Sequence, residues 1–306
     1  MIATQLALLK REIWEHRAIS VVPIVVAILT ALTSMVGQVT ISEIPHLDAG
    51  IIGLTNLPDN ARAASLSLIM TGLSTSFIFA MWILTIFYAL DSLYAERKDR
   101  SILFWRSMPV TDFDTVLSKL LTALFVIPIV TLLIIMATHI IVLLSFSIQI
   151  GFRGGSPWTL IWSAAPFFDT WAATLVLLVA LPLWLSPFIG WFLFVSAFTN
   201  RSPLLVAAMP IVLLPILEKL FIGSSLFVDA FFVRSMKWPL FGGLDNMELL
   251  MREGEDFAKL ADAELSLFGL MDLGGFLSSP QLWLGLVVCG LFTAAAIYVR
   301  RYRDDS

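Results

Sequence analysis

The sequence predicts an all-α protein that crosses a membrane six times. Hydrophobic residues make up 58% of the 306 residues and charged residues 14%. The mean hydropathy of +0.90 exceeds that of soluble domains. A helix needs roughly 20 apolar residues to span a hydrocarbon core of about 30 Å, and the sequence contains several apolar runs of that length. These observations place the chain among polytopic helical membrane proteins.

The first segment, residues 1–17, favours an amphipathic helix that lies in the membrane interface. Leu6, Leu9 and Ile13 fall on one helical face, and the charged residues lie elsewhere. Such a helix would anchor the chain beside its first span. The alternative is that these residues are only the polar flank of that span.

The six spans are delimited by apolar runs and by breaks rich in Gly and Pro. The fourth span contains Pro182 and Pro187 and the fifth Pro210 and Pro215, and each proline is expected to kink its helix. The longest segment outside the spans is 222–280. The predicted spans are 18–38, 68–90, 117–146, 169–197, 203–221 and 281–299.

The segment 91–116, between the second and third spans, mixes charge with exposed apolar residues. Ile102, Phe104 and Trp105 form its apolar centre. A contiguous apolar surface that faces water usually marks a binding site, so this segment is expected to bind a partner. Thr111 is expected to begin the next helix through a capping-box arrangement.

The basic residues predict the orientation of the chain. If both termini lie inside the cell, the inner segments hold 12 Lys and Arg residues and the outer segments hold 7. Inner segments of membrane proteins are enriched in Lys and Arg. We therefore expect both termini and the 91–116 segment to be cytoplasmic, and 222–280 to lie outside.

The sequence lacks the motifs of catalysis and of nucleotide binding. There is no GxxxxGK[ST] phosphate loop, no HExxH and no GxSxG, so neither enzymatic activity nor a cofactor or metal in this chain is expected. The net charge of −4 gives no reason to expect a nucleic-acid partner. Charges are nearly missing from the middle of the spans, where ion-coupled transporters keep them. A driving force would therefore come from another protein.

Two features of the spans leave alternatives open. His139 is an ionisable residue within the third span; it has either a functional role or a hydrogen-bonded structural one. Trp184, Phe188 and Trp191 recur at helical spacing around the prolines of the fourth span. They form either bundle packing, a lipid-facing belt or an aromatic wall along a substrate path.

The run YAERKDRSILFWRSMPVTDFDTVLSKLL resembles the segment after the second membrane helix in ABC type-2 exporter permeases. The shared pattern is an acidic–basic pair, a hydroxyl residue, an apolar run, a Ser-x-Pro turn and a lysine that opens the third helix. The matching residues here are Glu96-Arg97, Ser101, Ile102 to Trp105, Ser107-Met108-Pro109-Val110 and Lys119. The interfacial helix, the six spans and the long outer segment extend the likeness over the whole chain. Where many relatives have a glycine after the arginine, this chain has Lys98-Asp99-Arg100.

The resemblance implies a plasma- or inner-membrane permease that pairs with a second copy or a related permease, within membrane lipid. Two cytoplasmic ABC ATPase subunits, which bind ATP and Mg, would supply the energy. Their contact would lie on the 91–116 segment, with apolar anchors inside a polar surround, because aromatic and Arg residues dominate interface hot spots. The expected contact residues are Glu96, Arg97, Arg100, Ile102, Phe104, Trp105 and Arg106.

Other interpretations of the same sequence remain. Glu96 and Arg97 could pair with each other or cap the inner end of the second span instead of contacting an ATPase. The whole chain could be a membrane anchor that recruits a cytoplasmic partner and transports nothing. An intramembrane enzyme is a third interpretation, although no motif supports it.

Overall fold

The computed structural model describes residues 2–42, 58–99, 110–236, 240 and 266–302, and its regular elements are all helical. Six of these helices are long and apolar enough to cross a membrane, which confirms the predicted all-α, six-span architecture. The elements are α1 (Ile2–Glu15), α2 (Ala18–Ser42), α4 (Asp59–Lys98), α6 (Asp112–Leu121), η1 (Thr122–Val126), α7 (Ile127–Phe152), η2 (Trp158–Trp162), α8 (Phe167–Trp184), α9 (Ser186–Phe198), α10 (Pro203–Phe221), α11 (Leu226–Met236), α14 (Leu273–Ser278) and α15 (Pro280–Tyr302).

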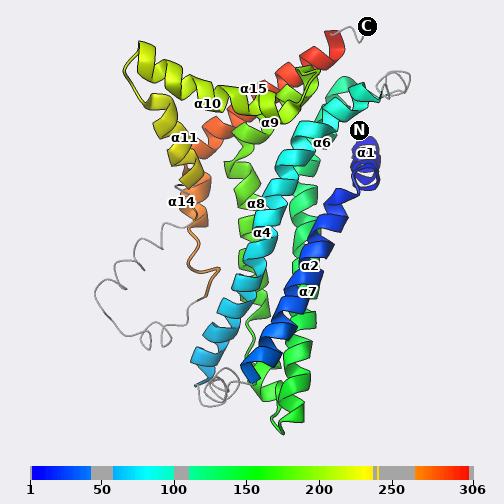
Figure 1. Ribbon diagram of the computed structural model, residues 1–306, viewed down its shortest axis with the longest axis vertical. Helices are drawn as coiled ribbons and strands as arrows, with labels where there is room; N and C mark the ends of the chain where they lie inside the picture. The colour runs from blue at the N-terminus through cyan, green and yellow to red at the C-terminus, as the bar shows by residue number, and fades with distance from the viewer. Residues whose placement is uncertain (1, 43–57, 100–109, 237–239, 241–265, 303–306) are drawn as a thin grey trace.

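The bundle has two distinct ends (Figure 1). Helices α2, α4, α7 and α8 run side by side along the long axis, and α10 and α11 project to one side. At one end, which we call the charged end, α1 and the last turns of α15 pack against α6. At the other, the far end, α4 begins and α7 ends.

Two of the spanning helices are longer than a bilayer requires. Helix α4 has 40 residues, and the continuous helix α6–η1–α7 covers 41. At 1.5 Å per residue each is about 60 Å long, roughly twice the thickness of a hydrocarbon core. The spans expected at 68–90 and 117–146 therefore cover only part of these helices.

A π-helical turn, η1, interrupts the third span. It joins α6 to α7 without breaking the chain direction, and it lies just after Lys119. The N-terminus of α6 has the predicted cap, because the backbone N–H of Asp114 donates to the Thr111 hydroxyl (3.1 Å) and that hydroxyl donates to the Asp114 carboxylate (2.6 Å). The start of α6 is thus fixed by its own sequence.

The fourth span is interrupted, and the fifth is continuous. The region predicted as one span, 169–197, consists of α8 and α9, which are separated at Leu185 between Pro182 and Pro187. A proline lacks the N–H that would continue the helical ladder, which explains the break. Helix α10 remains one helix although it contains Pro210 and Pro215.

Within the described residues the interior consists of a large central core and two small ones, one at the far end and one between α4, α9 and α10. The central core holds Phe77, Ile135 and Trp184, and the far-end core is formed by α4, α7 and η2. Between helices α4, α7 and α8, His139 is buried. The Trp171 indole N–H donates to its Nδ1 (3.2 Å), so the neutral ring carries its proton on Nε2, 3.2 Å from the Ser74 hydroxyl. This agrees with the hydrogen-bonded structural alternative.

Helix α9 packs most closely against α15 at a glycine. A Cβ added to Gly190 would lie 2.9 Å from both the Cα and the carbonyl oxygen of Cys289. Gly290, the residue after Cys289 in α15, is exposed, and a Cβ there would meet nothing within 4 Å. Only a glycine at position 190 permits this approach of the two backbones.

The glycine contact yields a first prediction. Gly190→Ala should lower the free energy of unfolding by about 1–3 kcal/mol, because the methyl group overpacks a rigid backbone contact. The matched variant Gly290→Ala should be neutral or stabilising by up to about 1 kcal/mol, since alanine is the better helix former. Unfolding in mixed micelles with increasing SDS measures both. Equal effects of the two substitutions would contradict the close packing of α9 on α15.

Candidate functional site

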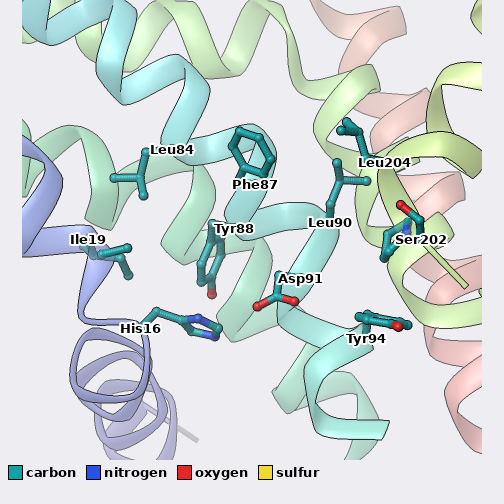
Figure 2. Close-up of a pocket in the computed structure, with 12 residues that line it drawn as sticks. His16, Ile19, Leu84, Phe87, Tyr88, Leu90, Asp91, Tyr94, Ser202 and Leu204 are labelled. Atoms are coloured by element: carbon teal, nitrogen blue, oxygen red, sulfur yellow. The ribbon is translucent and has the colours of Figure 1, made fainter. Parts of the chain in front are cut away.

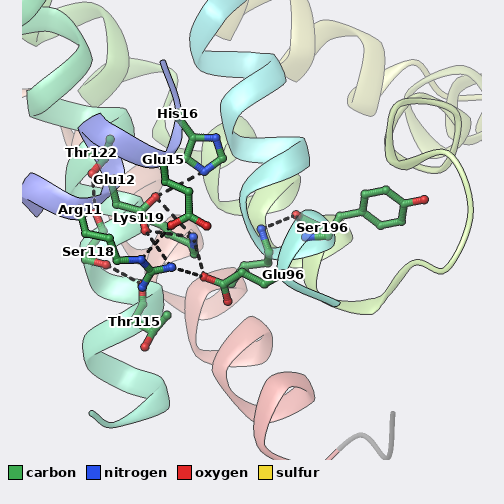
Figure 3. Close-up of polar contacts among 12 residues, drawn as sticks. Arg11, Glu12, Glu15, His16, Glu96, Thr115, Ser118, Lys119, Thr122 and Ser196 are labelled. Carbon is green, nitrogen blue, oxygen red and sulfur yellow. Dashed lines mark hydrogen bonds and ion pairs between the residues drawn. The ribbon is translucent and has the colours of Figure 1, made fainter. Parts of the chain in front are cut away.

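A lysine is buried between two carboxylates at the charged end. Lys119 on α6 is 0% exposed, and its Nζ lies 3.1 Å from Glu12 Oε1 of α1 and 3.0 Å from Glu96 Oε1 of α4 (Figure 3). Glu12 and Glu96 are 0% and 2% exposed. One ammonium group therefore joins three helices that are remote in the sequence.

Arg300 extends these ion pairs to the last helix. Its Nη1 donates to Glu96 Oε2 at 2.5 Å, and its Nε donates to Asp112 Oδ1 at 3.0 Å. Arg11 of α1 adds a third cation, because its Nη2 donates to Glu96 Oε1 at 2.9 Å. Helices α1, α4, α6 and α15 are thus joined by one cluster. We call it the charge network; it consists of Arg11, Glu12, Glu96, Asp112, Lys119 and Arg300.

The second carboxylate oxygen of Glu12 accepts from Lys119 (3.3 Å) and from an aromatic neighbour. The Tyr88 hydroxyl of α4 donates to Glu12 Oε2 at 2.7 Å. His16, which lies between α1 and α2, has its Nε2 3.6 Å from the same oxygen, and its ring meets Tyr88 edge-on at 4.9 Å. Both oxygens of Glu12 and of Glu96 therefore have partners, as buried carboxylates require.

The charge network contributes more to fixing the relative positions of its four helices than to the stability of the fold. Taking ions out of water costs several kcal/mol for each ion, and their mutual attraction offsets this cost only when geometry and hydrogen bonding are good. Removing one partner leaves a buried charge uncompensated. The network therefore penalises any arrangement in which α1, α4, α6 and α15 separate.

Arg97 holds the C-terminus of α9 against α4. Its Nη2 donates to the carbonyl oxygens of Ser196 (2.7 Å) and Thr199 (2.6 Å), which are among those left unpaired at a helix end. Glu96 and Arg97 thus both have partners within the chain, on different helices. Their predicted contact with an ATPase remains a prediction, and the other expected contact residues, Arg100, Ile102, Phe104, Trp105 and Arg106, lie outside the described residues.

The three predicted substrate-path aromatics contact different helices. Trp184 is buried, and its indole N–H donates to the Arg234 carbonyl of α11 (2.8 Å). Trp191 donates to the Ala207 carbonyl of α10 (3.2 Å). Phe188 lines a groove between α9, α11 and α15. The structure therefore gives Trp184 and Trp191 packing and hydrogen-bonding partners, and it brings Phe188 to a cavity.

A pocket opens beside the charge network. It has a volume of about 450 Å³ and lies between the α1–α2 junction, α4 and the start of α10 (Figure 2). Most of its wall is apolar, and the exposed carboxylate of Asp91 provides charge. We call it the α4–α10 pocket; its lining includes His16, Ile19, Leu84, Phe87, Tyr88, Leu90, Asp91, Tyr94, Ser202 and Leu204.

His16 stands between this pocket and the charge network, and its surroundings disfavour protonation. Burial lowers the pKa of His16 below the usual 6.5, and the Lys119 ammonium acts in the same direction. The carboxylates of Glu12, Glu15 and Asp91 oppose this shift without reversing it. At neutral pH His16 is therefore uncharged.

Several of these residues could not be assigned from the sequence. Glu12 and Arg300 are separated from Glu96 by 84 and 204 residues in the chain. In the sequence, Glu12 and Arg300 are each a polar residue next to an apolar segment, with no sign of a partner. The available signal was Lys119 itself, a charge inside an otherwise apolar run, which must find a partner when buried. Within the described residues no group of three or more His, Cys, Asp or Glu side chains could hold a metal ion.

The charge network yields a second prediction. Lys119→Met should lower the free energy of unfolding by about 3–5 kcal/mol, because Glu12 and Glu96 lose their shared cation while they remain buried. Lys98→Met removes an exposed lysine near the same end of α4 and should change stability by less than about 0.5 kcal/mol. SDS-induced unfolding compares the two. Equal losses would show that Lys119 is not buried among these carboxylates.

The pKa of His16 yields a third prediction. Because this pKa is lower in the folded chain than in the unfolded chain, the unfolded chain binds more protons in mild acid. The stability contributed by neutral His16 is complete above about pH 6.5 and is lost as the pH falls toward the lowered pKa. The melting temperature should therefore fall more between pH 7.5 and 5.5 in the wild type than in His16→Gln. Equal falls would contradict the assignment.

Comparisons with known proteins give this chain no relative. It matches no protein-family model, no curated protein and no solved structure.

Proposed function

We propose that this chain is the membrane-spanning subunit of an ATP-driven exporter that moves a hydrophobic or amphipathic substrate. In this proposal both termini are cytoplasmic and the chain lies in the plasma or inner membrane. A separate ABC ATPase, in two copies, binds and hydrolyses ATP with Mg. A second copy of the chain, or a related permease, completes the transporter.

The segment 91–116, which is expected to bind the ATPase, is called the docking segment. The observation that carries the proposal is the position of the charge network beside this docking segment. Glu96 lies near the end of α4 and Asp112 begins α6, so both helices that flank residues 99–111 are held by it. Through Lys119 and Arg300 the same network reaches α1 and α15. A partner that moved the docking segment would therefore move four helices together, as a transporter driven from outside the membrane requires.

The distribution of charge supports an external source of energy. Glu218, at the end of α10, accepts hydrogen bonds from the backbone N–H groups of Leu226 and Phe227 at the start of α11. Asp169, in the first turn of α8, accepts from the backbone N–H of Leu267 (2.8 Å). These carboxylates fix the ends of elements. Ion-coupled transporters instead keep ionisable groups near the middle of the membrane.

Apolar surfaces support a membrane-embedded partner and an amphipathic substrate. Helix α10 has only Ala207 buried, which leaves most of its surface to lipid or to a second permease. The α4–α10 pocket combines an apolar wall with the carboxylate of Asp91. A site of this kind suits a molecule with one apolar and one polar part.

The alternative, a membrane anchor that transports nothing, uses the same docking segment. The charge network would then serve as a rigid support. The two functions differ in one measurable property: a transporter subunit reconstituted with its ATPase shows hydrolysis that its substrate stimulates, whereas an anchor does not.

The fourth prediction concerns the docking segment. Trp105→Ala and Ile102→Asp should leave the protein inserted in the membrane but abolish copurification of an ATPase that carries a phosphate-binding loop, because the apolar anchors of the interface are lost. Mass spectrometry of the material purified in mild detergent measures this.

The matched control is Trp158→Ala. Trp158 is an exposed tryptophan of η2 at the far end, and its removal should leave copurification unchanged. An ATPase that still copurifies with Trp105→Ala and Ile102→Asp would remove the docking role. Copurification that is lost from all three variants would point to general misfolding.

A further inference from the structure

Another cation, Arg234, lies in a different part of the molecule from the charge network. It stands in the last turn of α11, and its side chain contacts Trp184 of α8 and Gln281 of α15. Its guanidinium stacks on the ring of Trp184, with Cζ 4.1 Å from the ring centroid. Its Nη1 donates to the backbone carbonyl of Gln281 at 2.6 Å. The guanidinium thus contacts two elements.

Two donors of this guanidinium are unsatisfied. Nε and Nη2 of Arg234 are buried and have no hydrogen-bond partner. The Nε–H and Nη2–H bonds leave the same edge of the guanidinium plane, which is one of the edges that bind carboxylate or phosphate through two parallel hydrogen bonds. Burial of unsatisfied donors on a charged group is costly. An anionic acceptor bound at this edge would remove that cost.

Gly285 makes room for the guanidinium. A Cβ added at this glycine would overlap Arg234 Nη2, at 1.9 Å, and would lie 2.8 Å from its Cζ. The side chain therefore lies directly on the backbone of α15. Any larger residue at position 285 would push the guanidinium out of this place without changing its charge.

The surroundings of Arg234 are suited to an alkyl chain. Arg234 forms part of the wall of the groove between α9, α11 and α15, which has a volume of about 600 Å³. Its lining is almost entirely apolar and aromatic, with Phe188, Phe227, Phe231, Leu284 and Val288 among its members. No carboxylate is among the lining residues. The groove thus places one cation beside a long apolar wall.

We propose that the groove between α9, α11 and α15 binds an amphiphile with an anionic head group, a phosphate, sulfate or carboxylate. The head group pairs with the free edge of Arg234 after a small rotation of the partly exposed side chain, and the alkyl chain lies along Phe188 and Phe231. Gln281 and Arg300 are 19 residues apart on α15, about 28 Å along the helix. The head group therefore lies about that distance along α15 from the charge network. The inference concerns binding alone and holds whether or not the chain transports a substrate.

The test measures binding to the full chain in an uncharged detergent. Dodecyl phosphate should raise the melting temperature at low concentration, and dodecyltrimethylammonium, which has the same chain length and the opposite charge, should not. Inorganic phosphate should also give no shift, since it lacks the chain. In Arg234→Gln the half-saturating concentration of dodecyl phosphate should rise at least about tenfold, because two charge-assisted hydrogen bonds are lost.

Further variants separate the site from general effects. Arg234→Lys keeps the charge but loses the two-donor edge and should fall between the wild type and Arg234→Gln. Gly285→Ala should weaken binding as Arg234→Gln does, with the charge unchanged. Arg201→Gln, which removes an exposed arginine outside the groove lining, should bind like the wild type.

Two results would overturn the proposal. One is an equal response to the anionic and cationic probes; the other is an unchanged affinity for dodecyl phosphate in both Arg234→Gln and Gly285→Ala. Native mass spectrometry of protein without added probe distinguishes the source of the ligand. An anionic phospholipid retained by the wild type and lost from Arg234→Gln identifies a resident lipid. Wild type without retained phospholipid that still binds dodecyl phosphate identifies an exchangeable amphiphile.

Discussion

The arrangement of the charged end depends on one ammonium group shared by two buried carboxylates. Lys119 cannot leave Glu12 and Glu96 without losing both of its carboxylate partners, while the two carboxylates lose the cation that they share in a buried site. Because these residues come from α6, α1 and α4, the helices hold one another in a single relative position. Arg300 adds α15 to the same constraint.

The two ends of the molecule are held by different forces. At the charged end, ion pairs join the helices, and they are specific because both oxygens of Glu12 and of Glu96 have defined donors. At the far end, α4 and α7 are held by apolar packing around Met70 and Leu143 and by the hydrogen bonds of His139. Packing tolerates small displacements more readily than buried charges do. A force applied at the charged end would therefore move it as a unit.

The sequence predicted the elements well and their contacts poorly, for physical reasons. Apolar runs report which residues can face lipid, so the number and type of the spans followed directly. They do not report where a helix ends, and α4 continues well before and after the predicted span at 68–90. The charge network and the contact of Arg234 with Trp184 arise between residues remote in the chain, which no local pattern encodes. Only the unusual burial of a charge such as Lys119 could have signalled that a partner was required.

The π-helical turn η1 sets the rotation of α6 about the helix axis relative to α7. A π turn holds one more residue than an α turn, and one residue corresponds to about 100° of rotation around a helix axis. If η1 rewound into α geometry, α6 would turn by that angle while α7 stayed in place, and Lys119 would swing away from Glu12 and Glu96. A local change of winding over five residues would then break the ion pairs that join α6 to α1 and α4 at the charged end.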